Sequence, residues 1–150
     1  MNTVIILVFT VCIAAAFSEQ QPYLIPKFSI VLGGTVVWRD GDVIWSPTLD
    51  DKTSTERMDL TRSLCHNLKD QILRRSNVTA IPTSCEMLWI NHEDNNAISY
   101  MEYDQKLPLV LEDLYKIFLP NEVTDDAHYK TVTHYQLGAE VTNSECKKCL

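Results

Sequence analysis

The sequence is poor in glycine and proline and has no excess of positive charge, and each shortage excludes a class of protein. Four glycines and six prolines in 150 residues exclude a collagen-like chain and a Pro/Gly-rich low-complexity chain. Thirteen basic against twenty acidic residues give a formal net charge of −7. A nucleic-acid-binding protein needs a basic surface to neutralise phosphates, so no nucleic acid is expected as a partner. Because 45% of the residues are hydrophobic, the chain can bury a core, and its length predicts one globular domain.

Long apolar runs are also missing after the N-terminus. Residues 4–17 form an apolar stretch, which is followed by Ser18 and a polar run. Small residues at Ala16 and Ser18 suit signal peptidase and predict a signal peptide over residues 1–18. The alternative is an uncleaved anchor, but the stretch is shorter than the roughly 20 residues that a membrane-spanning helix needs. We therefore expect a secreted, extracellular protein with no membrane span after signal removal.

The cysteines agree with an oxidising compartment. Cys65, Cys85, Cys146 and Cys149 remain after removal of the signal. An even number predicts two disulfides, for which three connectivities are possible. A bond between Cys65 and Cys85 would close a loop of about 20 residues. The spacing of Cys146 and Cys149 also occurs in redox pairs and zinc sites, but redox pairs usually begin a helix and these two lie at the C-terminus, so we interpret them as structural.

Hydrophobic patterning predicts six elements between residues 28 and 141. Residues 19–27, with two prolines and little periodicity, are expected to be a flexible lead-in. A helix is predicted to begin at Thr53 as N-cap, with Glu56 completing a capping box. Its apolar stripe is formed by Leu60, Leu64, Leu68 and Ile72. A second helix is expected between Pro108 and Pro120, and strands over residues 28–38, 85–90, 97–103 and 128–141, before a Cys-containing tail at residues 142–150.

This order of elements predicts a fold class. Strand, helix, strand, strand, helix, strand is the ferredoxin-like βαββαβ order, an α+β fold. It is expected to form a four-stranded antiparallel sheet with two helices on one face. The pair Gly33-Gly34 within the first strand predicts a bulge or a close approach of another backbone.

One modification site stands out, and no catalytic or metal site does. Asn77-Val78-Thr79 is an N-glycosylation sequon in the loop after the first helix. The four histidines (His66, His92, His128 and His134) are interpreted as solvated or hydrogen-bonded side chains. No nucleophile and base, cofactor motif or metal-ligand set is recognisable, so we do not expect an enzyme.

The passage from Trp45 to Glu56, Trp-Ser-Pro-Thr-Leu-Asp-Asp-Lys-Thr-Ser-Thr-Glu, and the helix after it resemble the start of an SEA domain. The resemblance extends over residues 28–141. It implies an extracellular βαββαβ module of glycosylated surface and secreted proteins, acting through contacts with an unknown protein or glycan. Some members cleave their own backbone at a Gly-Ser before a strand. The matching positions here are Asn95-Asn96-Ala97-Ile98, and Ser99 lies inside the predicted strand, so the chain is expected to stay intact.

A secreted cystatin-like protease inhibitor is the alternative function. A small acidic chain with a helix, antiparallel strands and two late cysteines is similar to that family in outline. Gln136-Leu137-Gly138 resembles its Gln-x-Val-x-Gly wedge only weakly and lies near the C-terminus.

Overall fold

The structure is a computed structural model that describes residues 23–38, 46–118 and 124–144. The predicted signal peptide, Trp45, Cys146 and Cys149 lie outside these residues. The chain divides into two compact units, residues 26–140 and residues 1–25 with 141–150. In its described part the smaller unit contains the first residues of one strand and the last residues of another.

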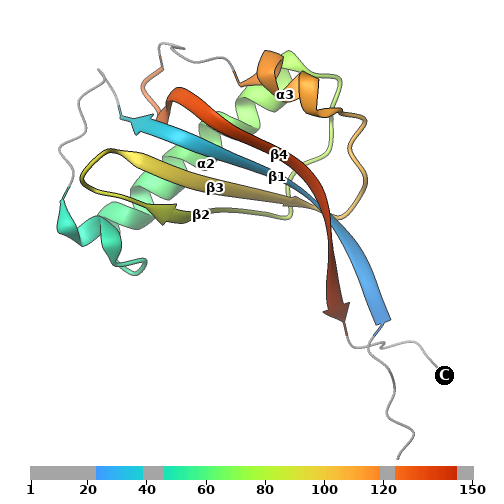
Figure 1. Ribbon diagram of the computed structural model, residues 1–150, viewed down its shortest axis with the longest axis horizontal. Helices are drawn as coiled ribbons and strands as arrows, with labels where there is room; N and C mark the ends of the chain where they lie inside the picture. Colours follow the sequence, from blue (N-terminus) through green and yellow to red (C-terminus); the bar gives the residue numbers. More distant parts are fainter. Residues whose placement is uncertain (1–22, 39–45, 119–123, 145–150) are drawn as a thin grey trace, which may run out of the picture. The chain divides into compact units, whose positions relative to one another are not determined.

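The elements follow the predicted order (Figure 1). They are the strand β1 (Tyr23–Val37), the short 3-10 helix η1 (Pro47–Asp50), the helix α2 (Thr55–Arg75), the strands β2 (Ser84–Ile90) and β3 (Asn96–Tyr103), the helix α3 (Leu111–Ile117) and the strand β4 (His128–Ser144). The sheet order is β2-β3-β1-β4, and β3 pairs antiparallel with both β1 and β2. The α+β fold with a four-stranded antiparallel sheet and two helices is therefore confirmed.

Both helices lie on the same face of the sheet. The α2 stripe predicted from sequence is fully buried, since Leu60, Leu64, Leu68 and Ile72 are at most 1% exposed. Strand β3 alternates in burial as a sheet covered on one face should, and it turns Ala97, Ser99, Met101 and Tyr103 to the core. Helix α3 contributes Leu114 and Ile117 to the same core.

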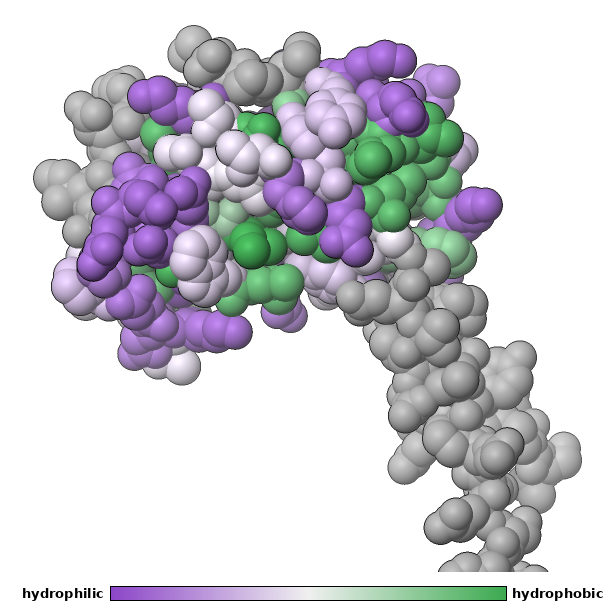
Figure 2. Space-filling model, viewed as in Figure 1, coloured by the Kyte–Doolittle hydropathy of each residue, from purple (hydrophilic) through white to green (hydrophobic). Residues whose placement is uncertain are grey.

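A hydrogen bond fixes α3 beside the end of α2. The Nη1 of Arg75 donates to the carbonyl oxygen of Ile117 over 3.0 Å. Tyr135 of β4 also contacts α3. Its hydroxyl donates to the carbonyl oxygen of Phe118, directly after the helix, and its ring centroid lies 4.3 Å from that of Tyr115. Figure 2 is drawn from the side of the sheet opposite α2, and it shows an apolar area near α3. Val110 and Leu111, at the start of α3, are exposed.

The start of α2 differs from the prediction. Ser54 is the N-cap, and its hydroxyl accepts the Arg57 N–H over 3.1 Å. Thr53 belongs to the preceding turn, where its N–H and its hydroxyl both donate to Asp51 Oδ1. Glu56 contacts the hydroxyl of Thr48. The capping box predicted at Thr53 is therefore wrong, because the Asp51 side chain takes Thr53 for a turn before the helix begins.

Other boundaries also shift. Residues 23–27, within the predicted flexible lead-in, belong to β1, and β4 continues to Ser144. Helix α3 begins only at Leu111, where Asp113 Oδ2 accepts the Val110 N–H over 3.0 Å. The prolines Pro22 and Pro26 hid the start of β1 from the sequence pattern, although Tyr23, Leu24 and Ile25 are strand-favouring residues.

The close backbone approach predicted at the glycine pair is present. A Cβ atom at Gly34 would clash with the carbonyl oxygen of Thr131 on β4 and lie 2.9 Å from the Cα of Val132. Gly34 is therefore required where β1 and β4 meet.

Candidate functional site

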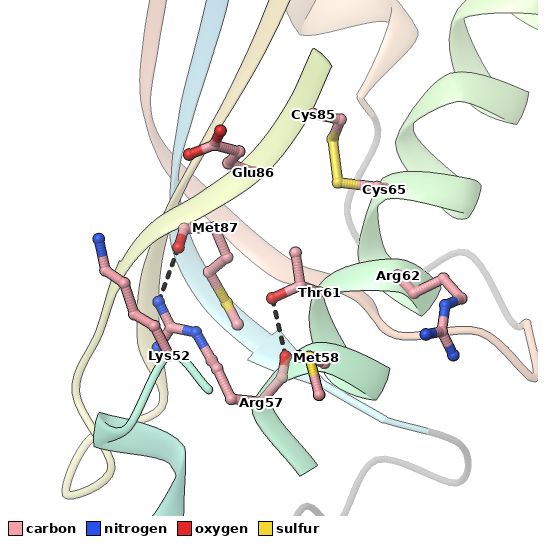
Figure 3. Close-up of a pocket in the computed structure, with 9 residues that line it drawn as sticks. All are labelled: Lys52, Arg57, Met58, Thr61, Arg62, Cys65, Cys85, Glu86 and Met87. Carbon is pink, nitrogen blue, oxygen red and sulfur yellow. Dashed lines mark hydrogen bonds between the residues drawn. A yellow bond between two sulfur atoms is a disulfide. The ribbon is translucent and has the colours of Figure 1, made fainter. Parts of the chain in front are cut away.

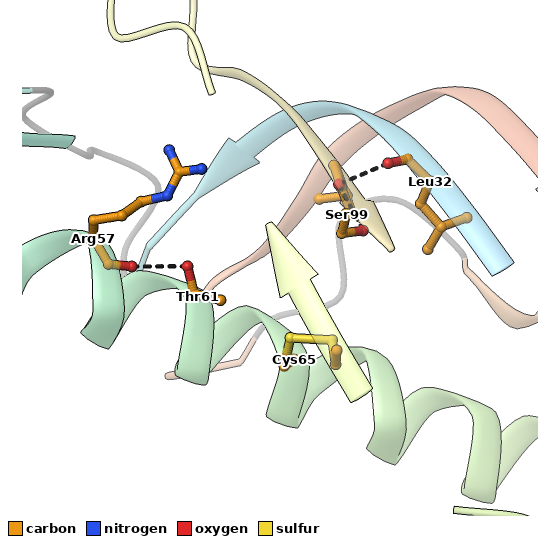
Figure 4. Close-up of a disulfide and its surroundings, with 7 residues drawn as sticks. Leu32, Arg57, Thr61, Cys65 and Ser99 are labelled. Carbon is orange, nitrogen blue, oxygen red and sulfur yellow. Dashed lines mark hydrogen bonds between the residues drawn. A yellow bond between two sulfur atoms is a disulfide. The ribbon is translucent and has the colours of Figure 1, made fainter. Parts of the chain in front are cut away.

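A disulfide joins α2 to the edge strand β2 (Figure 4). Cys65 and Cys85 are 20 residues apart in sequence, and their Cα atoms lie 5.9 Å apart. Among the pairings that the sequence leaves open, this one is present, while Cys146 and Cys149 lie outside the described residues. The bond attaches the outermost strand of the sheet directly to the helix that covers it.

The sequon occupies a short turn directly after α2. Ser76 ends the helix, with its hydroxyl donating to the carbonyl oxygen of Ile72 and accepting the Val78 N–H. Val78 is only 3% exposed, whereas Asn77 and Thr79 on either side of it are exposed. A buried anchor between two exposed residues presents the asparagine to solvent.

Three of the four histidines, His66, His92 and His128, are hydrogen-bonded to aspartate groups. His66 Nδ1 lies 2.8 Å from Asp126 Oδ2, and His128 Nδ1 lies 2.9 Å from the carbonyl oxygen of Asp126. His92 Nδ1 lies 3.1 Å from Asp50 Oδ2, at the other end of α2. In the part of the chain that the structure describes, no group of three or more His, Cys, Asp or Glu side chains is placed to hold a metal ion.

Ser99 is engaged inside the core. It is 1% exposed, and its Oγ lies 2.9 Å from the hydroxyl of Tyr129. The turn before β3 contains Asn95, whose φ of 62° lies in the left-handed region that asparagine tolerates. Asn96 is therefore the residue that begins β3. Ser99 lies inside this strand, as predicted, and its hydroxyl is already hydrogen-bonded to that of Tyr129.

A groove of about 530 Å³ lies between the first turns of α2 and the strand β2 (Figure 3). Its apolar part is formed by Met58, Met87 and the disulfide. Four charged side chains complete the lining together with Thr61, namely Lys52, Arg57, Arg62 and Glu86. Figure 3 shows Lys52 and Arg57 at one end of the groove and the disulfide at the other.

Arg57 is the structural centre of this groove. It is 4% exposed, although a charged side chain is rarely buried without an ionic partner. Its Nη1 donates to the carbonyl oxygen of Leu49 over 3.0 Å, and its Nη2 to that of Met87 over 2.7 Å. Burial lowers the pKa of the Arg57 guanidinium, and the charge of Asp50 opposes this effect.

The hydrogen bond from Arg57 to Met87 also pairs a backbone carbonyl on the edge strand of the sheet. Strand β2 carries a bulge between Met87 and Trp89, which leaves Leu88 and Trp89 partly exposed. An edge strand presents unpaired backbone groups that can pair with another chain. Arg57 covers one of these groups at the bulge, and the disulfide holds the strand two residues earlier.

Sequence reasoning did not single out Arg57, but a signal was present. Arg57 lies three residues before Leu60 and seven before Leu64, so it falls on the buried stripe of the helix. An arginine on an apolar stripe predicts a buried cation with specific partners. Those partners, two backbone carbonyls of η1 and β2, come from segments whose positions only the fold determines.

The weak cystatin-like segment lies within a strand. Gln136, Leu137 and Gly138 are in β4, where Leu137 packs against the core.

Among the described residues, no helix is long and apolar enough to cross a bilayer. Comparison with protein-family models, with curated proteins and with solved structures found no match to this chain.

Proposed function

We propose that this chain is a secreted, non-enzymatic extracellular glycoprotein module, similar to an SEA domain, that acts through contacts with proteins or glycans. The observation that carries the proposal is the exposed Asn77 beside a buried Val78, on a domain that contains the Cys65–Cys85 disulfide. Disulfides persist in oxidising compartments, where N-glycosylation of exposed sequons also takes place. The ferredoxin-like order of elements supports the similarity to SEA domains.

Secretion and modification are tested by expressing the full chain in secretory eukaryotic cells. We expect the protein in the medium, with a mass that falls after enzymatic removal of N-glycans. Thr79→Ala should abolish this mass difference, whereas Thr79→Ser preserves the sequon and should retain it. A chain that stays in the cells, or that reaches the medium with no N-glycan, would contradict this part of the proposal.

The secreted protein also separates the module from the alternative inhibitor. The module predicts no effect on papain, and nanomolar inhibition would establish the cystatin-like function instead. Capture of partners from the protein's own extracellular fluid, repeated with Asn77→Gln, then distinguishes contacts made by the protein surface from contacts made by its glycan. Failure of both forms to retain any partner would contradict action through contacts.

A further inference from the structure

The groove between α2 and β2 contains a buried positive charge, Arg57, whose hydrogen bonds go to neutral groups and whose charge Asp50 compensates only in part. Both acceptors of Arg57 are neutral carbonyl groups, and a guanidinium has five N–H donors. In the described part of the chain, the remaining donors of Arg57 have no acceptor. A buried charge that is only partly compensated is costly, so an anion that accepts from the remaining donors would be stabilised in the groove.

The other charges of the groove are also not paired with one another. Lys52 has no ion pair among the described residues. Glu86 also lines the groove, but its carboxylate points away from α2 (Figure 3), because Cys85 and Met87 on either side of it face the helix. Arg62 is engaged, because its Nη1 lies 2.8 Å from Asp59 Oδ1. Lys52 therefore adds a cation to the partly compensated charge of Arg57, and together they attract a single negative charge on a protein whose total charge is −7.

The rest of the lining indicates which kind of group the ligand has next to its anionic group. Met58, Met87 and the Cys65–Cys85 disulfide provide a soft apolar surface next to the charges. None of the nine lining residues is aromatic, so the groove offers no ring on which a sugar could stack. Its volume of about 530 Å³ falls within the range typical of small-molecule sites.

We propose that this groove binds an aliphatic carboxylate, with the carboxylate group against Arg57 and Lys52 and the hydrocarbon along Met58, Met87 and the disulfide. A free fatty acid and the C-terminal residue of a peptide with an aliphatic side chain share this chemistry. The inference does not depend on secretion, on glycosylation or on similarity to an SEA domain.

Titration of the purified, oxidised full chain by isothermal calorimetry and amide NMR tests the proposal. The probes are octanoate, N-acetyl-leucine, acetate and octylammonium, all at pH 7. We expect saturable 1:1 binding of octanoate, with shifts at the amides of α2 near Arg57 and of β2 near Met87. Acetate should bind at least tenfold more weakly, and octylammonium should not bind. The ratio of octanoate to N-acetyl-leucine affinity separates the two sources of the carboxylate.

Substitutions of two exposed residues should differ in their effect on the affinity. Lys52→Gln should weaken octanoate binding about two- to fivefold, whereas Glu86→Gln, whose carboxylate points away from α2, should change it by less than Lys52→Gln does. Lys130→Gln removes an exposed lysine on β4 and serves as the matched control, for which no change is expected. Arg57→Met should abolish binding where circular dichroism shows that it folds.

Some results would overturn the proposal whether or not the Arg57 variant folds. These are octanoate binding that does not saturate, equal binding of octylammonium, or an octanoate affinity that Lys52→Gln leaves unchanged. Shifts confined to the apolar pocket around Phe28, Leu107 and Leu137 would place the ligand elsewhere and have the same consequence.

Discussion

Two buried tyrosines should respond in opposite ways to the same substitution. The hydroxyl of Tyr129 lies 2.9 Å from Ser99 Oγ and 3.1 Å from the carbonyl oxygen of Leu32. The hydroxyl of Tyr103 is buried and has no hydrogen-bond partner among the described residues. Tyr129→Phe and Tyr103→Phe each remove one oxygen atom from the same core, so their comparison isolates the value of the hydrogen bond.

The size of each effect follows from what is left behind. Tyr129→Phe leaves the buried Ser99 hydroxyl without its partner, and removal of one buried partner costs about 1–3 kcal/mol. Tyr103→Phe removes a polar atom that gains nothing from burial, so the free energy of unfolding should stay unchanged or rise by up to about 1 kcal/mol. Guanidinium denaturation at pH 7 measures both values. A Tyr103→Phe variant that loses as much stability as Tyr129→Phe would refute this reasoning.

The same tyrosines determine the alkaline limit of stability. Burial raises the pKa of both Tyr103 and Tyr129 from 10.0 to about 12. The unfolded chain therefore loses these protons before the folded one, and stability that is complete below pH 10 falls as the pH rises toward 12. Each tyrosine contributes about 3 kcal/mol to this fall. Either Phe variant should remove roughly half of it, and an equal fall in both variants and the wild type would contradict the assignment.

Two further predictions concern the sheet and the disulfide. Gly34→Ala should lower the free energy of unfolding by more than about 3 kcal/mol, because the added Cβ meets the backbone of β4. At Gly138 an added Cβ would lie 3.6 Å from Ser29 Oγ, an ordinary contact. Gly138→Ala should therefore change the free energy of unfolding by no more than about 1 kcal/mol in the same denaturation assay. Equal losses for the two alanine variants would show that the approach of β4 is not what requires Gly34. The double variant Cys65→Ala/Cys85→Ala should lower the free energy of unfolding by about 3 kcal/mol, as expected for a loop of 20 residues. A change below about 1 kcal/mol in chemical denaturation would show that the unfolded chain is already restricted without the bond.

Much of the fold follows from local patterns. The stripe from Leu60 to Ile72 predicts α2 and its buried face, because the spacing of apolar residues matches the turn of a helix. The run around Gly33 and Gly34 predicts both a strand and the close approach of another backbone. Boundaries were less accurate, since the side chain of Asp51 competes for Thr53 and Pro26 interrupts a strand-favouring run.

The candidate groove could not be predicted in the same way. Its walls come from the turn before α2, the first turns of α2 and the strand β2, which are separated by up to 35 positions between Lys52 and Met87. Nothing local indicates that the guanidinium of Arg57 reaches the carbonyl oxygens of Leu49 and Met87. Hydrogen bonds to backbone carbonyls leave no trace in residue identity, because every residue has a carbonyl group.

The amino-acid order alone determined the sequence of strands and helices, the sequon at Asn77 and the set of cysteines, because periodicity, short motifs and residue counts are properties of neighbouring positions. Tertiary structure alone decided that Cys65 bonds to Cys85, that Val78 is buried so that Asn77 is presented to solvent, and that the buried guanidinium of Arg57 donates to two backbone carbonyls. These features depend on which segments are brought together when the helices cover the sheet, and burial, pairing and charge compensation exist only once that has happened.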